Sequence, residues 1–449
     1  MANNFDLVVV GTGSAGKAAA FAVREAGRRV AIVDSLPFGG TCQLRGCDPK
    51  KILVGAAELS DWARRMHGRG VSNQVAIDWP ALMRFKRAFT DPVPAQEEQA
   101  LSAAGISAFH GRARFADRAC LTVDGEALSA THFVIAAGAI PGPLRVPGED
   151  LVITSDRFLE LDRLPSDILF IGGGYISFEF AHVSARAGAK ATIVHRGARP
   201  LEGFDADLVA VLVEASRAVG IDVQLNATVS AIERRGERMQ VRAKQNGVER
   251  IFEADLAVHG AGRVPNIADL GLDEAGVTVT KKGVAVNEYL QSVSNSSVYA
   301  AGDAADGGGL PLTPVAGAEG AVVAENMMHG NAKKADLRVV PSIVYSIPPL
   351  AAVGLTQAQA AERGLRFRVV HDSMDSWYTS RRVDAKHTAF KTLIEEGTDT
   401  IIGAHVIGPD APEQINAFTL AMHAGLKAPA LRDLIFAYPT GSSDLEYML

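Results

Sequence analysis

Cys42 and Cys47 are separated by four residues in a segment that reads Gly-Gly-Thr-Cys-Gln-Leu-Arg-Gly-Cys-Asp-Pro-Lys-Lys from Gly39 to Lys51. Two thiols at this spacing can close a disulfide over one helical turn, and such a bridge can accept and release two electrons. The segment follows a strand-like run and a glycine-rich loop. This context favours a redox-active pair over two structural cysteines, whereas Cys120 stands apart in the sequence and is predicted to be a bystander.

The glycine-rich loop before the cysteines has the order strand, G-x-G-x-x-G, helix, strand, acid. The expected strands are 5–10 and 29–34, and the helix between them is expected to end near Ala26. Gly11 permits the tight turn, Gly13 lets a pyrophosphate approach the backbone, and Gly16 lets the helix pack closely on the strand. The helix N-terminus, beginning with Ser14 and Ala15, would face the phosphates. Asp34 ends the second strand, where it could accept hydrogen bonds from an adenosine ribose.

The same pattern recurs from residue 168 onwards. A strand at 168–171 leads into Gly172-Gly173-Gly174-Tyr175-Ile176-Ser177, then a helix to Ala187 and a strand at 190–194. Ser177 replaces the third glycine, and its side chain is small enough for this position. The second strand ends in His195 and Arg196, followed by Arg199, and not in an acid. Because a guanidinium matches a 2′-phosphate, NADPH is favoured over NADH.

Two dinucleotide folds imply two bound dinucleotides. A disulfide that is reduced by hydride needs a two-electron relay, which a flavin supplies. We therefore expect FAD at the first loop and NADPH, with NADH possible, at the second.

Composition limits the alternatives. The chain has 449 residues, 47% of them hydrophobic, which predicts a globular protein of about three domains. Its net charge of -6 argues against a nucleic-acid partner. Three cysteines are too few for the disulfide framework of a secreted protein. The first strand begins so early that no targeting segment is visible, and prolines interrupt the longest uncharged stretch, so we expect a soluble, cytoplasmic protein without membrane contact.

Beyond the loops and cysteines, further motifs make the chain similar to the pyridine nucleotide-disulfide oxidoreductases, the family that includes glutathione reductase, dihydrolipoamide dehydrogenase and mercuric reductase. These motifs are at 136–141, 262–266, 301–303, 312–316 and 353–356. The resemblance implies an α/β fold with two Rossmann-like dinucleotide-binding domains and a C-terminal α+β dimerisation domain. By this resemblance the FAD domain is 1–142 with 263–336, the NAD(P) domain is 143–262, and the interface domain of a homodimer is 337–449.

The last region supports this division by its own pattern. Residues 390–395 and 400–408 flank a Gly-Thr-Asp turn and predict a β-hairpin, and 413–425 predicts an amphipathic helix.

The resemblance also implies roles for individual residues. Cys42 would attack the substrate, and Cys47 would be the charge-transfer thiol against the flavin. Lys50 would lie near flavin N5 and pair with Glu179, and Tyr175 would gate the nicotinamide pocket. The expected FAD contacts are Gly11, Gly13, Ser14, Ala15, Gly16, Asp34, Thr41, Ala113, Gly138, Asp303, which would bond the ribitol, and Thr313. The expected NAD(P) contacts are Gly172, Gly174, Tyr175, Ile176, His195, Arg196, Arg199 and Gly262. No metal site is predicted.

The chain departs from the family near its C-terminus. Tyr438 stands where disulfide reductases have a catalytic His, and Ser443 takes the place of the accompanying Glu, with Asp444 one residue further. A phenol, whose ordinary pKa is about 10, is not a base at neutral pH, although it can donate a hydrogen bond.

Three activities remain open. The first is reduction of a disulfide whose leaving thiol is already acidic. The second is reduction of a non-disulfide acceptor, such as a soft metal ion including Hg(II), or a quinone. The third is a redox-sensing flavoprotein. In the first two cases the oxidant would be a small molecule or a small protein.

Asp48 is a second departure, because the family usually has an apolar residue directly after the second cysteine. A carboxylate there would raise the pKa of the Cys47 thiol. We expect Asp48 to turn outward and cap the following helix, with Pro49 at its first position.

Overall fold

The computed structural model describes residues 3–73 and 75–449. The chain divides into two compact units, which are described separately below. The first unit comprises Met1–Lys50, Phe85–Gly142 and Arg263–Leu337, and the second comprises Lys51–Arg84, Pro143–Gly262 and Arg338–Leu449. Two helices, α3 (Cys47–Arg65) and α4 (Trp79–Thr90), begin in one unit and end in the other.

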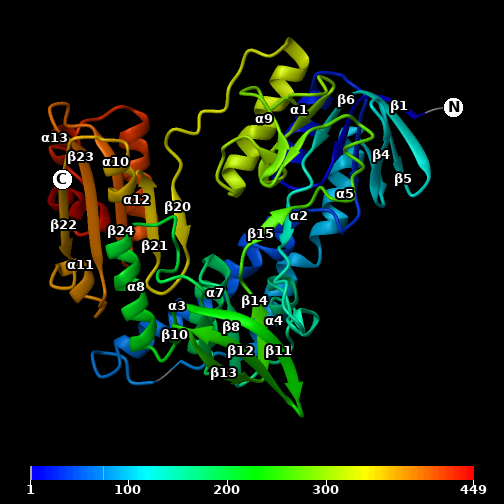
Figure 1. Ribbon diagram of the computed structural model, residues 1–449. Coiled ribbons are helices and arrows are strands. Elements are labelled where there is room, and N and C mark those ends of the chain that lie inside the picture. Colours follow the sequence, from blue (N-terminus) through cyan, green and yellow to red (C-terminus); the bar gives the residue numbers. More distant parts are fainter. Residues whose placement is uncertain (1–2, 74) are drawn as a thin grey trace. The chain divides into compact units, whose positions relative to one another are not determined.

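A seven-stranded sheet forms the centre of the first unit (Figure 1). Its order is β3-β2-β1-β6-β5-β4, with β18 also paired to β6. The strands β1, β2, β3, β6 and β18 are parallel, whereas β4 and β5 pair in antiparallel fashion. Their bounds are β1 Asn3–Val10, β2 Val30–Asp34, β3 Ser107–His110, β4 Ala113–Asp117, β5 Cys120–Val123, β6 Glu126–Ile135 and β18 Val298–Ala300.

Both faces of this sheet are buried. Leu7 and Val9 of β1 pack with α1 (Ser14–Glu25) and α9 (Thr313–His329). Val8 and Val10 point to the opposite face and pack with β4, β5 and the segment after residue 267. A parallel strand covered on both faces needs a continuous apolar run, and this is the pattern that the sequence shows at its start.

Shorter elements complete the first unit. Two small sheets pair β15 with β7, and β17 with both β16 and β19. Their bounds are β7 Ala139–Pro141, β15 Arg263–Pro265, β16 Val279–Thr280, β17 Gly283–Ala285 and β19 Ala305–Asp306. The remaining helices are α2 Gly40–Arg45, α5 Val93–Ala104 and a 3-10 turn at Gly302–Ala304.

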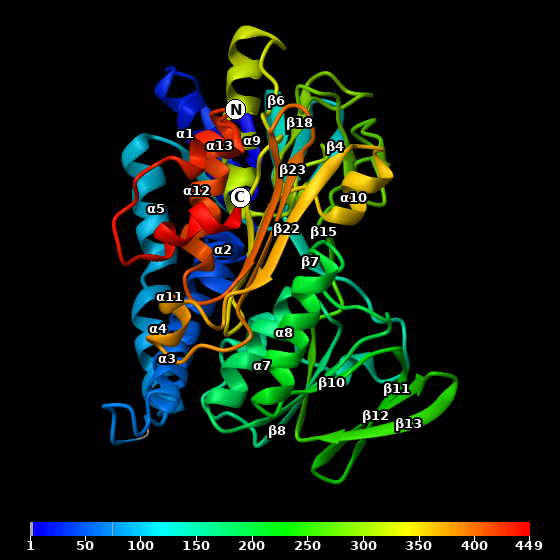
Figure 2. The same ribbon diagram turned by 90° about the vertical axis from the view of Figure 1, so that its left-hand side faces the viewer.

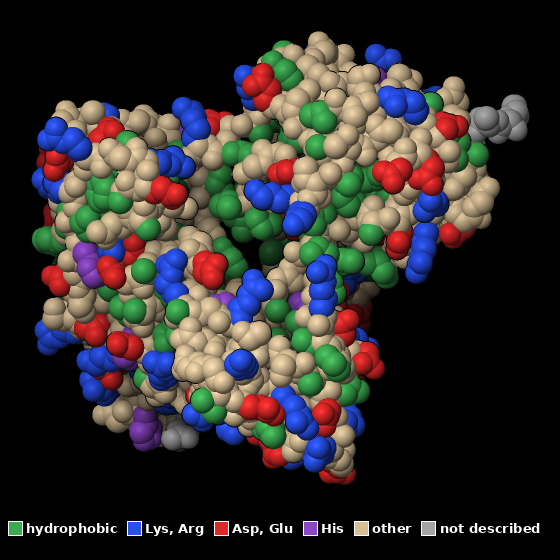
Figure 3. Space-filling view, viewed as in Figure 1, with side chains coloured by type: hydrophobic (Ala, Val, Ile, Leu, Met, Phe, Trp, Pro, Cys, Tyr) green, Lys and Arg blue, Asp and Glu red, His purple; other side chains and the backbone are tan. Residues whose placement is uncertain are grey.

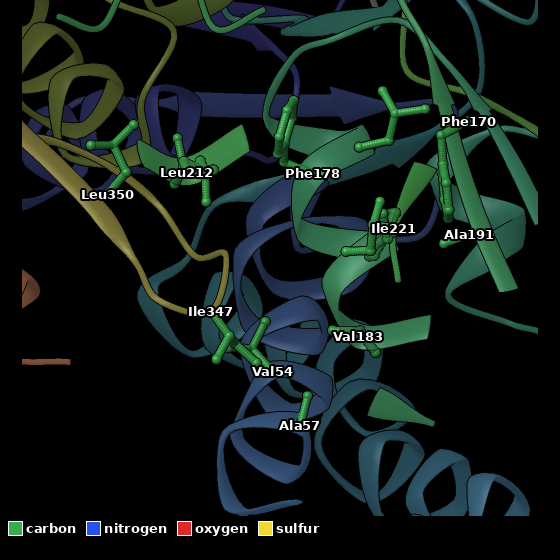
Figure 4. Packing of buried hydrophobic residues seen from close by; sticks show 14 of the residues in the cluster. Val54, Ala57, Phe170, Phe178, Val183, Ala191, Leu212, Ile221, Ile347 and Leu350 are labelled. Carbon is green, nitrogen blue, oxygen red and sulfur yellow. The ribbon is translucent and has the colours of Figure 1, made fainter. Parts of the chain in front are cut away.

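The second unit contains a parallel sheet of order β10-β9-β8-β14. Helix α7 (Tyr175–Arg186) covers one face, and the antiparallel sheet β11-β12-β13 covers the other. Figure 4 shows the packing of α7 on the parallel sheet, where Phe178 and Val183 of α7 lie among Phe170, Ala191 and Ile221. The bounds are β8 Asp167–Ile171, β9 Lys190–Val194, β10 Asp222–Gln224, β11 Ala227–Arg235, β12 Arg238–Gln245, β13 Val248–Ala254, β14 Leu256–His259, α6 Ser155–Phe158, α8 Ala206–Ala218 and a 3-10 turn at Glu149–Leu151.

The C-terminal part of the second unit is built on a sheet of order β20-β21-β24-β23-β22 (Figure 2). Its pairs are antiparallel. Leu350 and Ile407 pack toward α8, whereas Val353 and Val406 face α12, so this sheet is also buried on both sides. The bounds are β20 Ser342–Val344, β21 Leu350–Gly354, β22 Phe367–Ser373, β23 Ala389–Glu395, β24 Ile401–Ile407, α10 Gln357–Glu362, α11 Tyr378–Arg381, α12 Ala411–His423, α13 Ala428–Arg432 and a 3-10 helix at Gly441–Met448.

The expected secondary structure agrees with these elements. Both strand-loop-helix-strand segments form as predicted, at β1-α1-β2 and β8-α7-β9. The predicted hairpin is β23-β24, and the predicted helix is α12, which begins two residues earlier than expected. The predicted α/β class is therefore confirmed.

Charged side chains of both signs are mixed over the face shown in Figure 3. Within the described ranges, no helix is both long enough and apolar enough to cross a bilayer.

Candidate functional site

The two cysteines lie on consecutive helices of the first unit. Cys42 is in α2, and Cys47 is the first residue of α3. Gly46 between the helices has φ -140° and ψ -114°, and a Cβ at this position would lie 2.9 Å from the carbonyl oxygen of Thr41. The break between the helices thus depends on a residue without a side chain. Both cysteines are free thiols in the structure.

Both sulfurs have polar neighbours. Cys42 Sγ donates to Asp48 Oδ1 at 3.7 Å. Cys47 Sγ lies 3.5 Å from the hydroxyl oxygen of Thr313, the first residue of α9. Cys47 therefore stands at the N-terminus of one long helix and in contact with the N-terminus of another, where the helix dipoles stabilise negative charge.

The surroundings drive the pKa values of the two thiols apart. A hydrogen bond from Cys42 is the main cause that lowers the pKa of Cys47 to about 6, aided by Thr313 and the Lys50 cation and opposed by burial and Asp48. The same hydrogen bond to Cys47, together with burial, raises the pKa of Cys42. At neutral pH, Cys47 is therefore the thiolate and Cys42 is the thiol, and the Cys47 sulfur and the Asp48 carboxylate share the single S–H proton of Cys42.

The expected capping role of Asp48 is wrong. Helix α3 begins at Cys47, so Asp48 lies inside its first turn and Pro49 is its third residue. The carboxylate accepts the S–H of Cys42. The sequence marked Asp48 as unusual but could not show that its side chain reaches back to the thiol.

The first glycine loop fits a dinucleotide. Gly11 has φ +109°, and a Cβ there would lie 2.2 Å from the carbonyl oxygen of Ala136. A Cβ on Gly16 would lie 2.0 Å from the carbonyl oxygen of Gly11. A Cβ on Gly13, by contrast, would have no atom within 4 Å, and this residue caps α1, which starts with Ser14 and Ala15. The backbone is thus tightly turned inside the loop and open at the point where a pyrophosphate would approach.

Asp34 helps to hold this loop. Its Oδ2 accepts from the Thr12 backbone N at 2.9 Å and from the Thr12 hydroxyl at 2.7 Å. The same hydroxyl accepts from the backbone N of Gly39 at 3.2 Å, which links the loop to the segment that carries Cys42. Sequence reasoning missed Thr12, because the middle position of G-x-G tolerates many residues.

Asp303 lies in the 3-10 turn Gly302–Ala304, where burial raises the pKa of its carboxyl and the Arg263 cation partly offsets this. Glu319, only 2% exposed, accepts from the backbone N of Gly302 at 2.7 Å and fixes this turn. Glu319 was also missed, although an acid among the apolar residues of α9 was a signal that could have found it.

The remaining predicted FAD residues are all in the first unit. Thr41 is in α2, and Gly138 has φ +67° just before β7. Ala113 begins β4, two residues after Gly111, whose backbone N donates to the carbonyl oxygen of Asp34 at 3.0 Å.

The second glycine loop has a similar design. Gly172 has φ +115°, and a Cβ there would lie 2.2 Å from the carbonyl oxygen of Gly260. Gly174 caps α7, whose first residues are Tyr175 and Ile176. Ser177, at the third glycine position, is fully buried, and its Oγ would be 2.1 Å from a Cβ on Gly260. The missing side chain at Gly260 therefore makes the room that Ser177 takes up.

The predicted nucleotide-selecting residues separate in the structure. Arg199 donates to the carbonyl oxygens of Phe204 at 2.8 Å and Glu202 at 3.2 Å, and its own carbonyl pairs with His195 Nε2 at 3.1 Å. These two side chains shape the loop after β9. Arg196 instead lines a pocket of about 630 Å³ whose other residues come from β11, β12 and the loops at their ends, namely Asn226, Thr228, Ser230, Lys244, Asn246 and Gly247. Gly262, with φ +110°, lies between β14 and β15.

Tyr175 and Glu179 are both held by partners within the second unit. The Tyr175 hydroxyl and Ser342 Oγ are 2.5 Å apart, and its ring packs edge-on against Phe204. Glu179 is 1% exposed, and its Oε1 accepts from the backbone N of Tyr345 at 2.9 Å. Lys50 belongs to the other unit, so its pairing with Glu179 stays a prediction.

Tyr438 lies on the surface of the second unit. Its side chain is 78% exposed and stacks on Tyr378. Asp444 Oδ2 accepts from the Thr379 hydroxyl at 2.5 Å, and burial raises the pKa of its carboxyl. Among the residues that the structure describes, no group of three His, Cys, Asp or Glu side chains is placed to bind a metal.

Two dinucleotide-binding folds and a thiol pair at a helix N-terminus define a flavin-dependent oxidoreductase of the disulfide type. The sequence matches the family description "Pyridine nucleotide-disulphide oxidoreductase" over residues 5–320 and its dimerisation domain over residues 340–449. The chain belongs to this family, as its sequence predicts. Its members bind FAD and a pyridine nucleotide, and the dimerisation domain supports a homodimer.

Curated relatives cover nearly the whole chain. A mercuric reductase of Staphylococcus aureus is 32% identical over 99% of this chain and 81% of its own length. A glutathione reductase of Burkholderia cepacia is 34% identical over 94% of this chain and 93% of its own length. Among solved structures, the Cu(II) complex of the HOCl-induced flavoprotein disulfide reductase RclA from Escherichia coli is 28% identical, covers 99% of both chains and superposes with a TM-score of 0.89.

Proposed function

We propose that this protein is an NADPH-dependent reductase that passes electrons to its acceptor through a redox-active Cys42–Cys47 pair. The observation that carries the proposal is the placement of the two thiols: Cys47 stands at the N-terminus of α3 beside the Thr313 hydroxyl, which favours a thiolate, and Cys42 next to it carries the proton. FAD, bound by the first glycine loop, would supply the two electrons that reopen the disulfide.

With a disulfide acceptor the exchange takes two steps. The Cys42 sulfur attacks one acceptor sulfur, the S–S bond of the acceptor breaks, and the first leaving sulfur takes up the proton that Cys42 loses and departs as a thiol. The Cys47 thiolate then attacks the Cys42 sulfur, which forms the Cys42–Cys47 disulfide and releases the second thiolate. The polar partner of Cys47 in this step is Thr313. Lys50, Glu179 and Tyr175 keep the roles that the family resemblance implies, as parts of this proposal, and Tyr438 would donate a hydrogen bond in place of the missing base.

The preference for NADPH rests on the pocket beside β9. Arg196 and Lys244 contribute two cations, and Thr228 contributes a hydroxyl donor. This donor set suits a 2′-phosphate better than a ribose hydroxyl. The corresponding domain division is 1–142 with 263–336 for FAD, 143–262 for NADPH and 337–449 for the dimer interface.

Reduction of a soft metal cation is the second candidate. Tyr438 replaces the base that an ordinary disulfide acceptor needs for its leaving thiolate, and a metal cation has no such leaving group. Two of the similar proteins favour this candidate, one a mercuric reductase and the other solved as a Cu(II) complex.

The test is an anaerobic assay of the FAD-loaded protein with NADPH and one acceptor at a time: glutathione disulfide, lipoamide, a quinone, Cu(II) or Hg(II). Cys42→Ser should abolish reduction of the true acceptor, whereas Cys120→Ser, the matched control, should leave it unchanged. Equal activity of Cys42→Ser on every accepted compound would contradict a dithiol output, and a preference for NADH would contradict the nucleotide assignment.

A further inference from the structure

Asp48 places a second negative charge beside the thiol pair. Its Oδ1 is 3.7 Å from Cys42 Sγ, and its side chain is exposed at the first turn of α3. The family resemblance assigns no role to this position, and the capping role expected from the sequence is not found. The carboxylate therefore has a contact with the substrate-attacking sulfur that the proposed function leaves unexplained.

The charges around Cys42 come mainly from one helix. On α3 they are the Cys47 thiolate, the Asp48 carboxylate and the Lys50 cation. From α9 the neighbour is the neutral hydroxyl of Thr313. Arg45 ends α2, three residues after Cys42. Of these charged groups, the Cys47 thiolate and the Asp48 carboxylate are both acceptors for the Cys42 S–H.

We propose that Asp48 is a positioning residue that selects acceptors by charge: its carboxylate holds the Cys42 S–H and repels anionic acceptors, so that the pair reacts preferentially with neutral or cationic ones. This inference rests on the proposed function, since it names the class of acceptor that the Cys42–Cys47 pair would reduce. The effect of Asp48 on the two thiols agrees with this proposal, because its negative charge raises the pKa of each.

The first test needs neither cofactor nor turnover. The reduced protein is alkylated with neutral iodoacetamide or with anionic iodoacetate, and mass spectrometry follows the peptides of Cys42 and Cys47 separately. The measured quantity is the rate at which iodoacetate alkylates Cys42, divided by the rate for iodoacetamide. In Asp48→Asn this ratio should rise about tenfold, since a unit charge a few ångströms away is removed. Asp48→Glu, which keeps the charge, should retain the low ratio. An unchanged ratio in Asp48→Asn would overturn the proposal.

The second test compares disulfides of different charge with the FAD-loaded enzyme and NADPH. Asp48→Asn should raise kcat/KM for anionic glutathione disulfide about tenfold relative to dicationic cystamine, with neutral lipoamide between them. Its pH profile should also move to lower pH, because both thiols lose a neighbouring negative charge. Equal gains for all three disulfides would mean that Asp48 acts on the thiol pKa alone and would overturn charge selection. If none of them is reduced by either form, the disulfide branch of the proposed function fails, while the alkylation ratio still decides the role of Asp48.

Discussion

The two sulfur atoms of the candidate site differ in their hydrogen-bond partners, and this difference orders their roles. Cys47 receives hydrogen bonds and stands at a helix N-terminus, whereas Cys42 donates and faces a carboxylate. A thiolate is stabilised by donors and by the positive end of a helix dipole. Cys47 is therefore suited to remain charged, and Cys42 is suited to carry the proton until an acceptor arrives.

Removing the donor should move the titration of Cys47. In the reduced protein the Cys47 thiolate should titrate near pH 6, and in Cys42→Ala its pKa should rise toward the ordinary value of 9.0. Absorbance of the thiolate at about 240 nm against pH measures this, with Cys47→Ser as the blank. The pKa of Cys47 is lower in the folded protein than in the unfolded chain. The thiolate therefore stabilises the folded protein fully above pH 9.0, the ordinary pKa, and this contribution is lost as the pH falls through about 6.

Thr313→Val provides the graded comparison for the same titration. It removes the hydroxyl 3.5 Å from Cys47 Sγ, a weaker cause of the lowered pKa than the Cys42 hydrogen bond. The pKa of Cys47 should rise less in Thr313→Val than in Cys42→Ala. A larger rise in Thr313→Val would reverse the assigned order of the two donors.

At this scale, the sequence revealed the reactive residue types but not all their contacts. The Cys42–Cys47 spacing is local and could be recognised directly. The contact between Asp48 and Cys42 depends on where α3 begins. Asp48 would cap a helix that begins at Pro49, but α3 begins two residues earlier, and Asp48 contacts the Cys42 thiol instead. Thr12 and Glu319 accept from backbone N–H groups that the sequence does not identify, although the acid among the apolar residues of α9 marks Glu319 as unusual.

Elements with local signals were predictable, and those that depend on distant pairing were not. Each dinucleotide loop lies within one short segment, and its glycines have the conformations that the motif requires. The pocket beside Arg196 is different, because its wall is the antiparallel sheet β11-β12-β13. Thr228 and Lys244 become neighbours only when β11 pairs with β12. Sequence reasoning therefore found Arg196 but not Lys244.

The second glycine loop and the segment directly after β14 should be coupled through Ser177 and Gly260. Gly260→Ala places a methyl group 2.1 Å from Ser177 Oγ in a fully buried site, so it should lower stability by about 1–3 kcal/mol. Adding Ser177→Gly removes the clash, and the double variant should show a coupling of about 1 kcal/mol in its favour. Urea denaturation of the four proteins measures this cycle.

Gly55→Ala serves as the control for that cycle. This glycine is inside α3, and an added Cβ would meet no atom within 4 Å, so the variant should gain about 0.5–1 kcal/mol from its higher helix propensity. Strictly additive effects of Gly260→Ala and Ser177→Gly would show that the serine and the glycine do not share this space.

At the scale of the whole molecule, the dimerisation domain exposes apolar side chains that a lone chain would leave in water. Leu420 of α12 is 70% exposed, and Ile435, between α13 and the final 3-10 helix, is fully exposed. Leu434 and Tyr438 lie in the same exposed segment. Clustered exposed apolar groups mark interaction surfaces, so this segment is where a homodimer would gain most from burial.

Ile435→Asp should therefore weaken the dimer, because a carboxylate in a buried interface has no compensating partner. Sedimentation velocity should show a dimer for the natural chain and a larger monomer fraction for the variant at the same micromolar concentration. Val248→Asp is the matched control, since Val248 is 63% exposed on β13, outside the dimerisation domain. If the proposed active site also needs Tyr438 of a second chain, Ile435→Asp should lose acceptor reduction while NADPH still reduces the bound flavin. A variant that stays dimeric would place the interface on another surface of this domain.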